Sequence, residues 1–275
     1  MTDRLTDARP LVSVVTVCFD AERHLAEAME SVLGQTYPDI EYLVVDGGST
    51  DGTLDVICSF ESRFGGRLRW ISEPDEGIYD AMNRGIDMAE GELVGLLNAD
   101  DAYLPDAIES VVAAYAESPD AGAVYGDVHV VDDAGALVRT ESAREPAQMP
   151  LRPEQMPFCH QSLFVARWAY EQLGGYDTRF HVLADYEWVL SARAADLPMV
   201  HVAVPLVRFR LGGACSADMA RSNAERERIR VRYGANPLIE RAKRVRHSVS
   251  RMVYAALRGG RAVSPAAPDG ERCEQ

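Results

Sequence analysis

Carboxylates gather where one apolar run of this chain ends. The residues Asn98-Ala99-Asp100-Asp101 follow directly after the apolar run at 93–97. Acidic groups this close repel one another unless a cation or strong hydrogen-bond donors neutralise them, and carboxylate oxygens are ligands that Mg2+ and Mn2+ prefer. Asp100 and Asp101 are therefore candidate metal ligands. An Asx-type turn before the helix that Pro105 begins explains the same residues, and this alternative stays open.

A second polar turn follows the apolar run at 41–45. Asp46 is followed there by a Gly-Gly pair and by the hydroxyl and acidic residues at 49–51. Glycines let a backbone approach a ligand closely, and residues 49–51 can cap the next helix. Ligands of open α/β sheets bind beyond the carboxyl ends of the strands, so Asp46 could hold a ribose or a base. A turn residue bonded to its own loop is the alternative.

A third candidate segment spans residues 75–85. In the helix expected there, Asn83 and Arg84 flank the inward side and could reach a phosphate or a donor sugar, although Arg84 could equally be a solvated cation. Asp75 and Asp80 could contact the donor or cap the helix. We expect the inward stripe itself to consist of Ile78, Ala81, Met82 and Ile86.

Alternating strands and helices must position these turns. We expect strands at 11–19, 40–45, 67–72 and 93–97, and helices at 22–33, 54–64, 78–89 and 106–116. Such alternation is typical of an α/β fold with a mostly parallel sheet and helices on both faces. A hairpin at 124–140 and a proline-rich loop at 142–157 then lead into a second half.

The three motifs, in this order and spacing, resemble the family 2 glycosyltransferases with the GT-A fold, over roughly residues 11–216. The resemblance implies an inverting enzyme that moves a sugar from a nucleotide-diphosphate donor to a hydroxyl of a saccharide or lipid-linked acceptor. It also implies Mg2+ or Mn2+ as cofactor. The variants at 79–83 and 159–161 look like members that build bacterial surface polysaccharides or glycolipids.

The resemblance also assigns roles to residues. Asp46 contacts the nucleoside, and Asp100, with Asp101, holds the metal on the diphosphate. Asp185 matches the family's Glu-Asp element and deprotonates the acceptor, although Ala184 replaces the usual Glu. This departure leaves open whether Glu187 shares or replaces that role, and a helix N-cap is the alternative for Asp185. The further donor contacts implied are Phe19, Asp20, Glu22, Asp75, Asn83, Arg84 and Asn98.

Two elements of the second half are candidates for framing the acceptor. His160 and Gln161 precede an apolar strand, and His160 could bind acceptor, phosphate or metal, or be a buried structural histidine. The segment 208–216 contains Arg210, a Gly pair and Ser216, as a loop closing over a diphosphate requires. Loop flexibility alone also explains these glycines.

Length and composition fit one large catalytic domain. The chain has 275 residues, of which 47% are hydrophobic and 26% charged. We expect a GT-A domain over 1–216, with a nucleotide-sugar half at about 11–131 and an acceptor half at about 132–216. Neither an apolar run of about 18 residues nor a signal core is present, which predicts a cytoplasmic protein. The five scattered cysteines indicate reduced thiols instead of a zinc site or disulfides.

Charge divides the chain unevenly. Residues 219–261 contain eleven arginines and one lysine against three glutamates, a net charge of +9, which leaves −24 for the rest of a chain whose net charge is −15. This division argues against a nucleic-acid partner. The basic amphipathic helices expected at 217–260 could lie on an anionic membrane, peripherally on the inner face of the cell membrane, or could dock on the acidic domain. The tail at 261–275 is predicted to be disordered.

Two other function classes share some of these features. A sugar-phosphate nucleotidyltransferase would share the sheet and the metal, but the glycine-rich, lysine-bearing entry loop is missing, and Lys243 is the only lysine. A noncatalytic nucleotide-sugar-binding protein is the second alternative. Products distinguish the enzymes, because a glycosyltransferase releases nucleoside diphosphate whereas a nucleotidyltransferase makes or consumes pyrophosphate.

Overall fold

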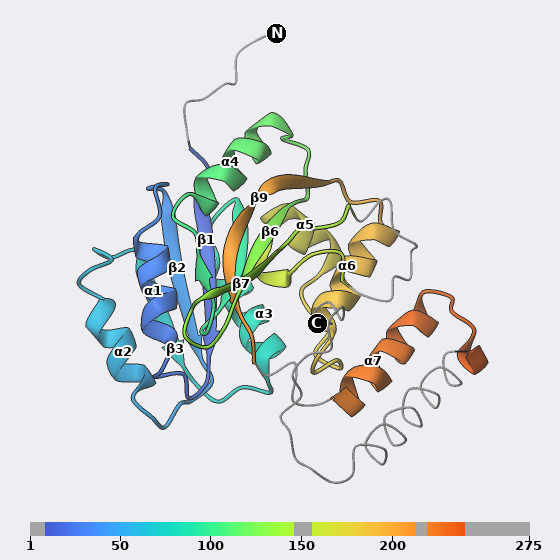
Figure 1. Cartoon of the computed structure of the whole chain (residues 1–275), viewed down its shortest axis with the longest axis horizontal. Coiled ribbons are helices and arrows are strands. Elements are labelled where there is room, and N and C mark those ends of the chain that lie inside the picture. The colour runs from blue at the N-terminus through green and yellow to red at the C-terminus, as the bar shows by residue number, and fades with distance from the viewer. Residues whose placement is uncertain (1–8, 146–155, 213–218, 240–275) are drawn as a thin grey trace.

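The fold is organised around one mixed β-sheet. The structure, a computed structural model, describes residues 9–145, 156–212 and 219–239 (Figure 1). The strands follow the order β3-β2-β1-β4-β8-β6-β9-β5, and β7 pairs with β6. Their bounds are β1 Val12–Cys18, β2 Ile40–Asp46, β3 Leu68–Ser72, β4 Leu93–Asn98, β5 Ala102–Tyr103, β6 Ala123–Val131, β7 Leu137–Glu141, β8 Leu163–Ala166 and β9 Met199–Arg210.

The helices connect these strands and cover both faces of the sheet. They are α1 Leu25–Leu33, α2 Thr53–Phe60, α3 Ile78–Met88, α4 Ala107–Glu117, α5 Arg167–Leu173, α6 Ala184–Ala194 and α7 Met219–Arg232, with a short 3-10 helix, η2, at His160–Ser162. Of the described helices, none combines the length and apolar composition that a membrane span needs.

The expected parallel sheet is confirmed for the first half of the chain. Strands β3, β2, β1 and β4 are mutually parallel neighbours. Strand β8 then pairs antiparallel with both β4 and β6, so β6 runs in the same direction as β4. The carboxyl ends of β1, β2, β4 and β6 therefore lie at one edge of the sheet. The expected hairpin is also present, because β6 and β7 pair antiparallel.

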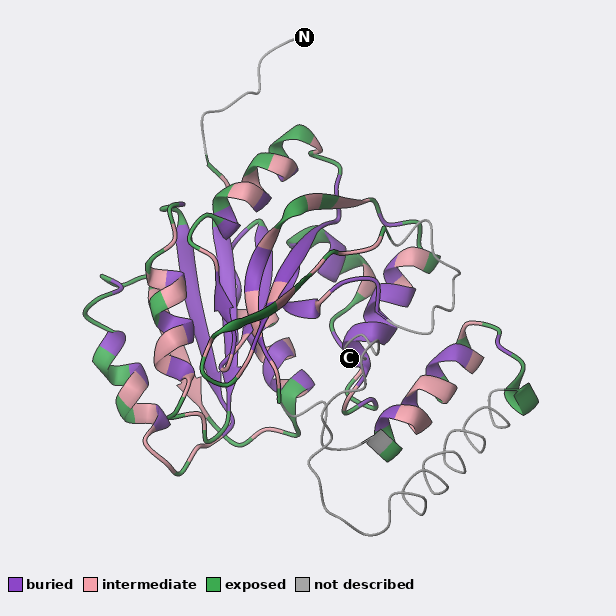
Figure 2. Cartoon of the chain, viewed as in Figure 1, coloured by how far each residue is buried: buried purple, intermediate pink, exposed green. Residues whose placement is uncertain are grey.

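Side-chain alternation in the strands builds a core on each face. In β1, Val12 and Val14 pack on the face that α1, α2 and α4 cover, whereas Val15 and Val17 pack on the face of α3, α5 and α6. The strands β1, β2, β4, β6 and β8 are buried almost throughout, whereas β7 is largely exposed and the helices expose their outer sides (Figure 2). Continuous valine runs suit such strands because both faces are covered. Helix α3 packs so closely that a Cβ at Gly85 would lie 2.2 Å from Val15 Cγ1.

The inward side of α3 differs from the expected stripe. Ala81 and Met82 are buried as predicted, but Ile78 is 39% exposed and Tyr79 is buried in its place. Helix α3 begins directly after Gly77, whose φ of 120° turns the chain, so Ile78 lies at the helix start and Tyr79 faces the core. The prediction for Ile78 was wrong because the helix start fixes which residues face inward.

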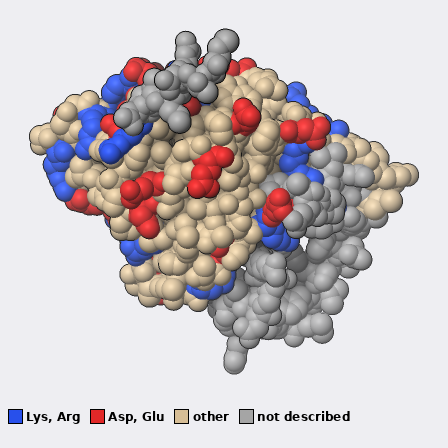
Figure 3. Space-filling model, turned by 90° about the horizontal axis from the view of Figure 1, so that it is seen from above, with Lys and Arg blue, Asp and Glu red and all other residues tan. Residues whose placement is uncertain are grey.

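The acidic charge of the described residues is distributed widely. Acidic side chains are spread over the face seen from above, and basic ones lie mainly toward its margins (Figure 3). The predictions for Ser216, most of the basic helices at 217–260 and the tail at 261–275 lie outside the described residues. The proposed domain limits stay predictions.

Candidate active site

The turn after β2 is folded around the Asp46 carboxylate, which is fully buried. Its Oδ2 accepts hydrogen bonds from the backbone N–H groups of Gly48 (3.1 Å) and Ser49 (2.9 Å) and from the Ser72 hydroxyl (2.6 Å). The Ser49 hydroxyl donates to Oδ1. Burial alone would raise the pKa of Asp46, but the hydrogen bonds from Ser49, Ser72 and the turn backbone lower it overall. The ionised carboxylate therefore shapes the turn, and its contact with a nucleoside stays a prediction.

Two acidic residues after β1 bind the same turn from the other side. Asp20 Oδ1 accepts the Thr50 N–H (2.8 Å), and Glu22 Oε2 accepts the Gly52 N–H (2.8 Å). The Asp20 backbone has a φ of 47° and donates its own N–H to Ser49 Oγ (2.8 Å). These contacts join the β1 and β2 exits into one unit. The contacts of Asp20 and Glu22 with the nucleotide stay predictions.

Gly47 lies between the Asp75 carboxylate and the Phe19 ring next to this unit. A Cβ added to Gly47 would lie 2.6 Å from Asp75 Oδ2 and 3.4 Å from the Phe19 ring. The Phe19 side chain is 65% exposed, and Asp75 Oδ1 accepts the Gly77 N–H (2.9 Å). Glycine at position 47 thus leaves room for the Asp75 carboxylate beside an exposed aromatic ring. A nucleobase could stack on that ring and donate an N–H to the carboxylate.

The loop after β4 presents buried oxygen atoms without protein partners. Asp101 is 2% exposed, and its Oδ1 accepts the backbone N–H of Arg210 (2.8 Å). Its Oδ2 and the Asn98 Oδ1 are buried and have no hydrogen-bond partner among the residues that the structure describes. Burial and the neighbouring Asp100 charge raise the pKa of Asp101 well above its usual range. A nearby cation would reverse this effect.

These oxygens fit a hard divalent cation by their chemistry. The described residues contain no ready cluster of three or more His, Cys, Asp or Glu side chains for a metal. The protein therefore offers a partial ligand set, centred on Asp100 and Asp101, that oxygen atoms of a bound diphosphate could complete.

Arg210 clamps this loop to two other elements. It is the last residue of β9, it is buried, and each guanidinium nitrogen donates a hydrogen bond. The acceptors are the carbonyls of Asp100 (3.1 Å), Asp132 (3.1 Å) and Asp133 (2.7 Å) and the Glu27 carboxylate (2.5 Å). Arg210 therefore fixes the loop after β4 against α1 and the hairpin turn. Its predicted contact with a diphosphate stays a prediction.

The candidate base lies on α6. Asp185 is 7% exposed and lies in the first turn of that helix. The Tyr79 hydroxyl lies 2.9 Å from Asp185 Oδ1 and 2.8 Å from the Val182 carbonyl oxygen. The N-cap position of α6 is Leu183, which makes no side-chain capping hydrogen bond, so the N-cap alternative for Asp185 is wrong. The carboxylate is instead held by a tyrosine from α3.

A buried aromatic group adjoins this carboxylate. His160 Nε2 lies 2.8 Å from the Tyr176 hydroxyl, and the Tyr176 and Tyr79 rings are 5.6 Å apart. Burial lowers the pKa of His160, and the Asp185 charge opposes this effect only in part. His160 is therefore a neutral, buried histidine at neutral pH. Sequence reasoning missed Tyr79 and Tyr176, because an aromatic residue in an apolar pattern indicates only burial.

The other predicted residues make contacts within the protein. Asn83 binds the backbone of Tyr176 twice, donating to its oxygen (2.9 Å) and accepting from its nitrogen (2.7 Å). Arg84 pairs with Asp80 (2.8 Å). Gln161 Oε1 lies 2.9 Å from the Cys159 thiol. Ligand roles for these residues stay predictions.

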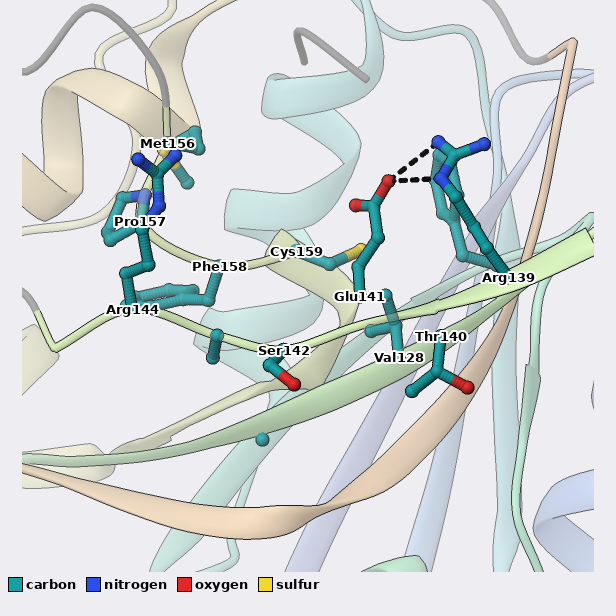
Figure 4. A pocket seen from close by; sticks show the side chains of 13 residues that line it. Val128, Arg139, Thr140, Glu141, Ser142, Arg144, Met156, Pro157, Phe158 and Cys159 are labelled. Carbon is teal, nitrogen blue, oxygen red and sulfur yellow. Dashed lines mark hydrogen bonds and ion pairs between the residues drawn. The ribbon is translucent and has the colours of Figure 1, made fainter. Parts of the chain in front are cut away.

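A hollow of about 460 Å³ opens beside the hairpin (Figure 4). It lies between β6, β7 and the segment 156–159, which leads into η2 and His160. Arg139 and Glu141 form an ion pair (2.6 Å) along one side, and Arg144 lies near Pro157 and Phe158 on the other. Apolar lining comes from Val128, Met156, Phe158 and Phe209. The hollow therefore combines apolar surface with polar and charged groups.

The sheet order and these turns define the fold of a GT-A glycosyltransferase, and comparisons with known proteins agree. The structure resembles a mannosyltransferase from Pyrobaculum calidifontis solved with GDP-Man and Mn2+ (TM-score 0.65, 18% identity, covering 93% of this chain and 77% of that one). It also resembles residues 1–349 of S. aureus TarS in complex with UDP-GlcNAc (TM-score 0.64, 14% identity, 84% and 69%). At these identities the likeness shows the fold alone.

The chain belongs to glycosyl transferase family 2, whose family model matches residues 13–173. A PGL/p-HBAD biosynthesis glycosyltransferase from Mycobacterium bovis is 31% identical over 252 residues, covering 89% of this chain and 94% of that protein. The O-antigen biosynthesis protein RfbC from Myxococcus xanthus is 31% identical over 212 residues, covering 76% of this chain and 16% of that longer protein. The protein is thus a glycosyltransferase.

Proposed function

We propose that this glycosyltransferase is an inverting, metal-dependent enzyme that moves a sugar from a nucleoside diphosphate to a hydroxyl of a saccharide or lipid-linked acceptor in cell-envelope polysaccharide or glycolipid synthesis. The observation that carries the proposal is the buried Asp185 carboxylate, oriented by Tyr79, in a chain whose β4 exit offers unpaired oxygens of Asn98 and Asp101. The relatives named for PGL/p-HBAD and O-antigen biosynthesis support the acceptor class.

The donor half of the proposal rests on the strand-exit turns. The nucleobase of the donor lies against Phe19 and Asp75, and the turn that contains Asp46 borders the ribose and the diphosphate. Asp100 and Asp101 would hold Mg2+ or Mn2+, which would supply positive charge to offset that of the diphosphate leaving group. Neighbours of the same fold were solved with UDP-GlcNAc and with GDP-Man and Mn2+, which supports a nucleotide-sugar donor and a divalent cation.

The acceptor half rests on Asp185 and on the hollow beside the hairpin. Asp185 accepts the proton of the acceptor hydroxyl while that oxygen bonds to the anomeric carbon and the bond from this carbon to the diphosphate breaks. One displacement inverts the configuration. The hollow runs along the segment leading to His160, which supports a role for its apolar lining and its Arg139–Glu141 pair in holding the part of the acceptor beyond the reacting hydroxyl.

Substitution of the candidate base tests this function. Asp185→Asn keeps the shape of the side chain but removes the proton acceptor, so turnover should fall by about a hundredfold or more while donor affinity stays within twofold. Chromatography of the products should show nucleoside diphosphate. Release of pyrophosphate would instead identify a nucleotidyltransferase, and donor binding without turnover in Mn2+ would identify a noncatalytic protein. Near-normal turnover in Asp185→Asn would exclude this residue as the base.

The metal assignment is tested separately. Asp100→Ala should abolish turnover at saturating Mn2+ and leave the melting temperature of the metal-free protein unchanged or higher, because one of two neighbouring charges is gone. Wild-type activity that persists in EDTA would contradict the assignment.

A further inference from the structure

A buried glutamate of α7 binds the backbone that leads into α6. Glu225 is 2% exposed although half of the residues of α7 are charged. Its Oε1 accepts the N–H of His181 (2.8 Å), and its Oε2 accepts those of Val182 (2.9 Å) and Leu183 (3.0 Å). A carboxylate with three backbone donors is a strong, directional anchor. The chain segment directly before α6 is therefore fixed by a residue far along the sequence.

This anchor lies where α6 has no cap of its own. The first N–H groups of a helix lack intrahelical partners, and α6 has no side-chain cap. The Glu225 charge at the N-terminal end also complements the helix dipole. Asp185 follows Leu183 by two residues, and the Val182 carbonyl bonded to Tyr79 belongs to the same anchored segment. Movement of residues 181–183 would displace both the carboxylate and the tyrosine that orients it.

Further contacts hold α7 and the residue after it against the same region. Glu187 Oε1 lies 2.8 Å from Arg232 Nη1 and accepts a hydrogen bond from the Tyr233 hydroxyl (2.9 Å). The Arg228 guanidinium lies over the Phe180 ring at 4.9 Å. Contacts thus flank Asp185 on both sides along the chain. They also cross the predicted domain limit at 216/217, and they engage the Glu187 oxygen that a catalytic base would need.

We propose that Glu225 is a positioning residue for Asp185, and that α7 sets acceptor activation without contributing to donor binding. This inference rests on the proposed role of Asp185. The donor-side turns at 46–52 and 98–101 are not among the groups that Glu225 binds. Loss of the anchor should therefore lower kcat and leave the donor KM unchanged, a separation that general destabilisation would not give.

Glu225→Gln in the full chain tests the proposal. Glutamine keeps the volume but presents an N–H2 group where a carboxylate oxygen met backbone N–H groups, so at least one amide loses its acceptor. We expect kcat to fall by about tenfold, corresponding to about 1.4 kcal/mol, with the donor KM within twofold. Amide hydrogen exchange at 181–183 should accelerate. Glu171→Gln is the matched control, because Glu171 is 69% exposed beside Arg167 on α5.

Each outcome decides the inference. Unchanged kcat, unchanged exchange at 181–183, or equal losses of kcat and donor affinity would each overturn it. If Glu225→Gln does not fold, Tyr233→Phe replaces it as the test, because it removes the hydroxyl that donates to Glu187. We then expect a few-fold lower kcat at constant donor KM. A wild-type kcat would overturn the proposal. If the wild-type protein transfers no sugar, the proposed function fails, and hydrogen exchange still judges whether Glu225 anchors the segment.

Discussion

Replacement of Asp46 by Asn tests whether this carboxylate stabilises the turn after β2. An asparagine oxygen in the place of Oδ2 can keep the hydrogen bonds from Gly48, Ser49 and Ser72. The amide group then takes the place of Oδ1 and cannot accept from the Ser49 hydroxyl. The strong hydrogen bond from the Ser49 hydroxyl is lost together with the long one from the Cys18 thiol (3.6 Å), and the remaining hydrogen bonds lose their charge assistance. A hydrogen bond to a charged group contributes about 1.5–3 kcal/mol, so we expect a loss of about 2 kcal/mol in unfolding free energy.

The pH dependence of this loss has a defined direction. The folded-state pKa of Asp46 is lowered by hydrogen bonds that outweigh burial, so the folded protein binds this proton less tightly than the unfolded chain does. The stabilisation is therefore present above the unfolded pKa of about 3.9 and is lost as pH falls through the folded value. The difference between wild type and Asp46→Asn should shrink below about pH 4.

Urea unfolding and thermal melts measure both effects. At pH 7 a loss of about 2 kcal/mol corresponds to a melting temperature lower by roughly 4–8 °C for a domain of this size. Asp55→Asn is the control, because Asp55 carries the same group in an exposed position of α2. Donor affinity measured by calorimetry should also fall, since the turn borders the proposed donor site. Equal stability of Asp46→Asn and wild type at pH 7 would refute the reasoning.

Three further predictions follow from the geometry. Gly47→Ala places a Cβ 2.6 Å from Asp75 Oδ2, so nucleoside diphosphate affinity measured by calorimetry should fall by about tenfold, and unchanged affinity would exclude Asp75 as a donor contact. Burial lowers the pKa of His160, so the stability that the neutral side chain gives to the folded protein is present above the unfolded pKa of about 6.5 and is lost as pH falls through the folded value. His160→Gln should therefore lose less stability between pH 7 and 5.5 than wild type. Equal losses in urea melts would contradict this. If the basic segment 217–260 binds membranes, the full chain should sediment with anionic liposomes at low salt and be released at high salt, whereas equal binding to neutral liposomes would contradict an electrostatic interaction.

Hydrophobic periodicity predicted the part of the fold that depends on local pattern. The valine-rich runs of β1 and β2 correctly indicated strands covered on both faces, and the Asp-Asp-Ala-Gly turn correctly indicated the hairpin of β6 and β7. Helix starts were less accurate, since α1 begins at Leu25 where a start at residue 22 was expected. Residues 22–24 form a turn, and Glu22 in this turn binds the loop after β2, a long-range interaction that no local pattern contains.

Buried polar residues were the least predictable from sequence. Glu225 lies in a helix whose pattern of Arg and Glu is typical of a solvated surface, yet it is buried by donors at 181–183. The insertion of β8 between β4 and β6 likewise depends on pairing between distant segments. A polar side chain is buried where its partners are, and sequence spacing does not reveal partners more than forty residues away in the chain.

The hydrogen bonds divide the predicted acidic residues into two groups. In the first group, carboxylate oxygens accept hydrogen bonds from backbone N–H groups of residues 48–52, so the negative charges are compensated inside the protein. This group consists of Asp20, Glu22 and Asp46. Asp101 differs, because its Oδ2 is buried and no group in the described part of the chain bonds to it. A buried carboxylate oxygen without a donor is costly unless it is protonated or meets a cation. We therefore expect the first group to hold the turn after β2 in its conformation through contacts within the protein. Any metal-dependent recognition of the donor would then depend on Asp101 and the loop after β4.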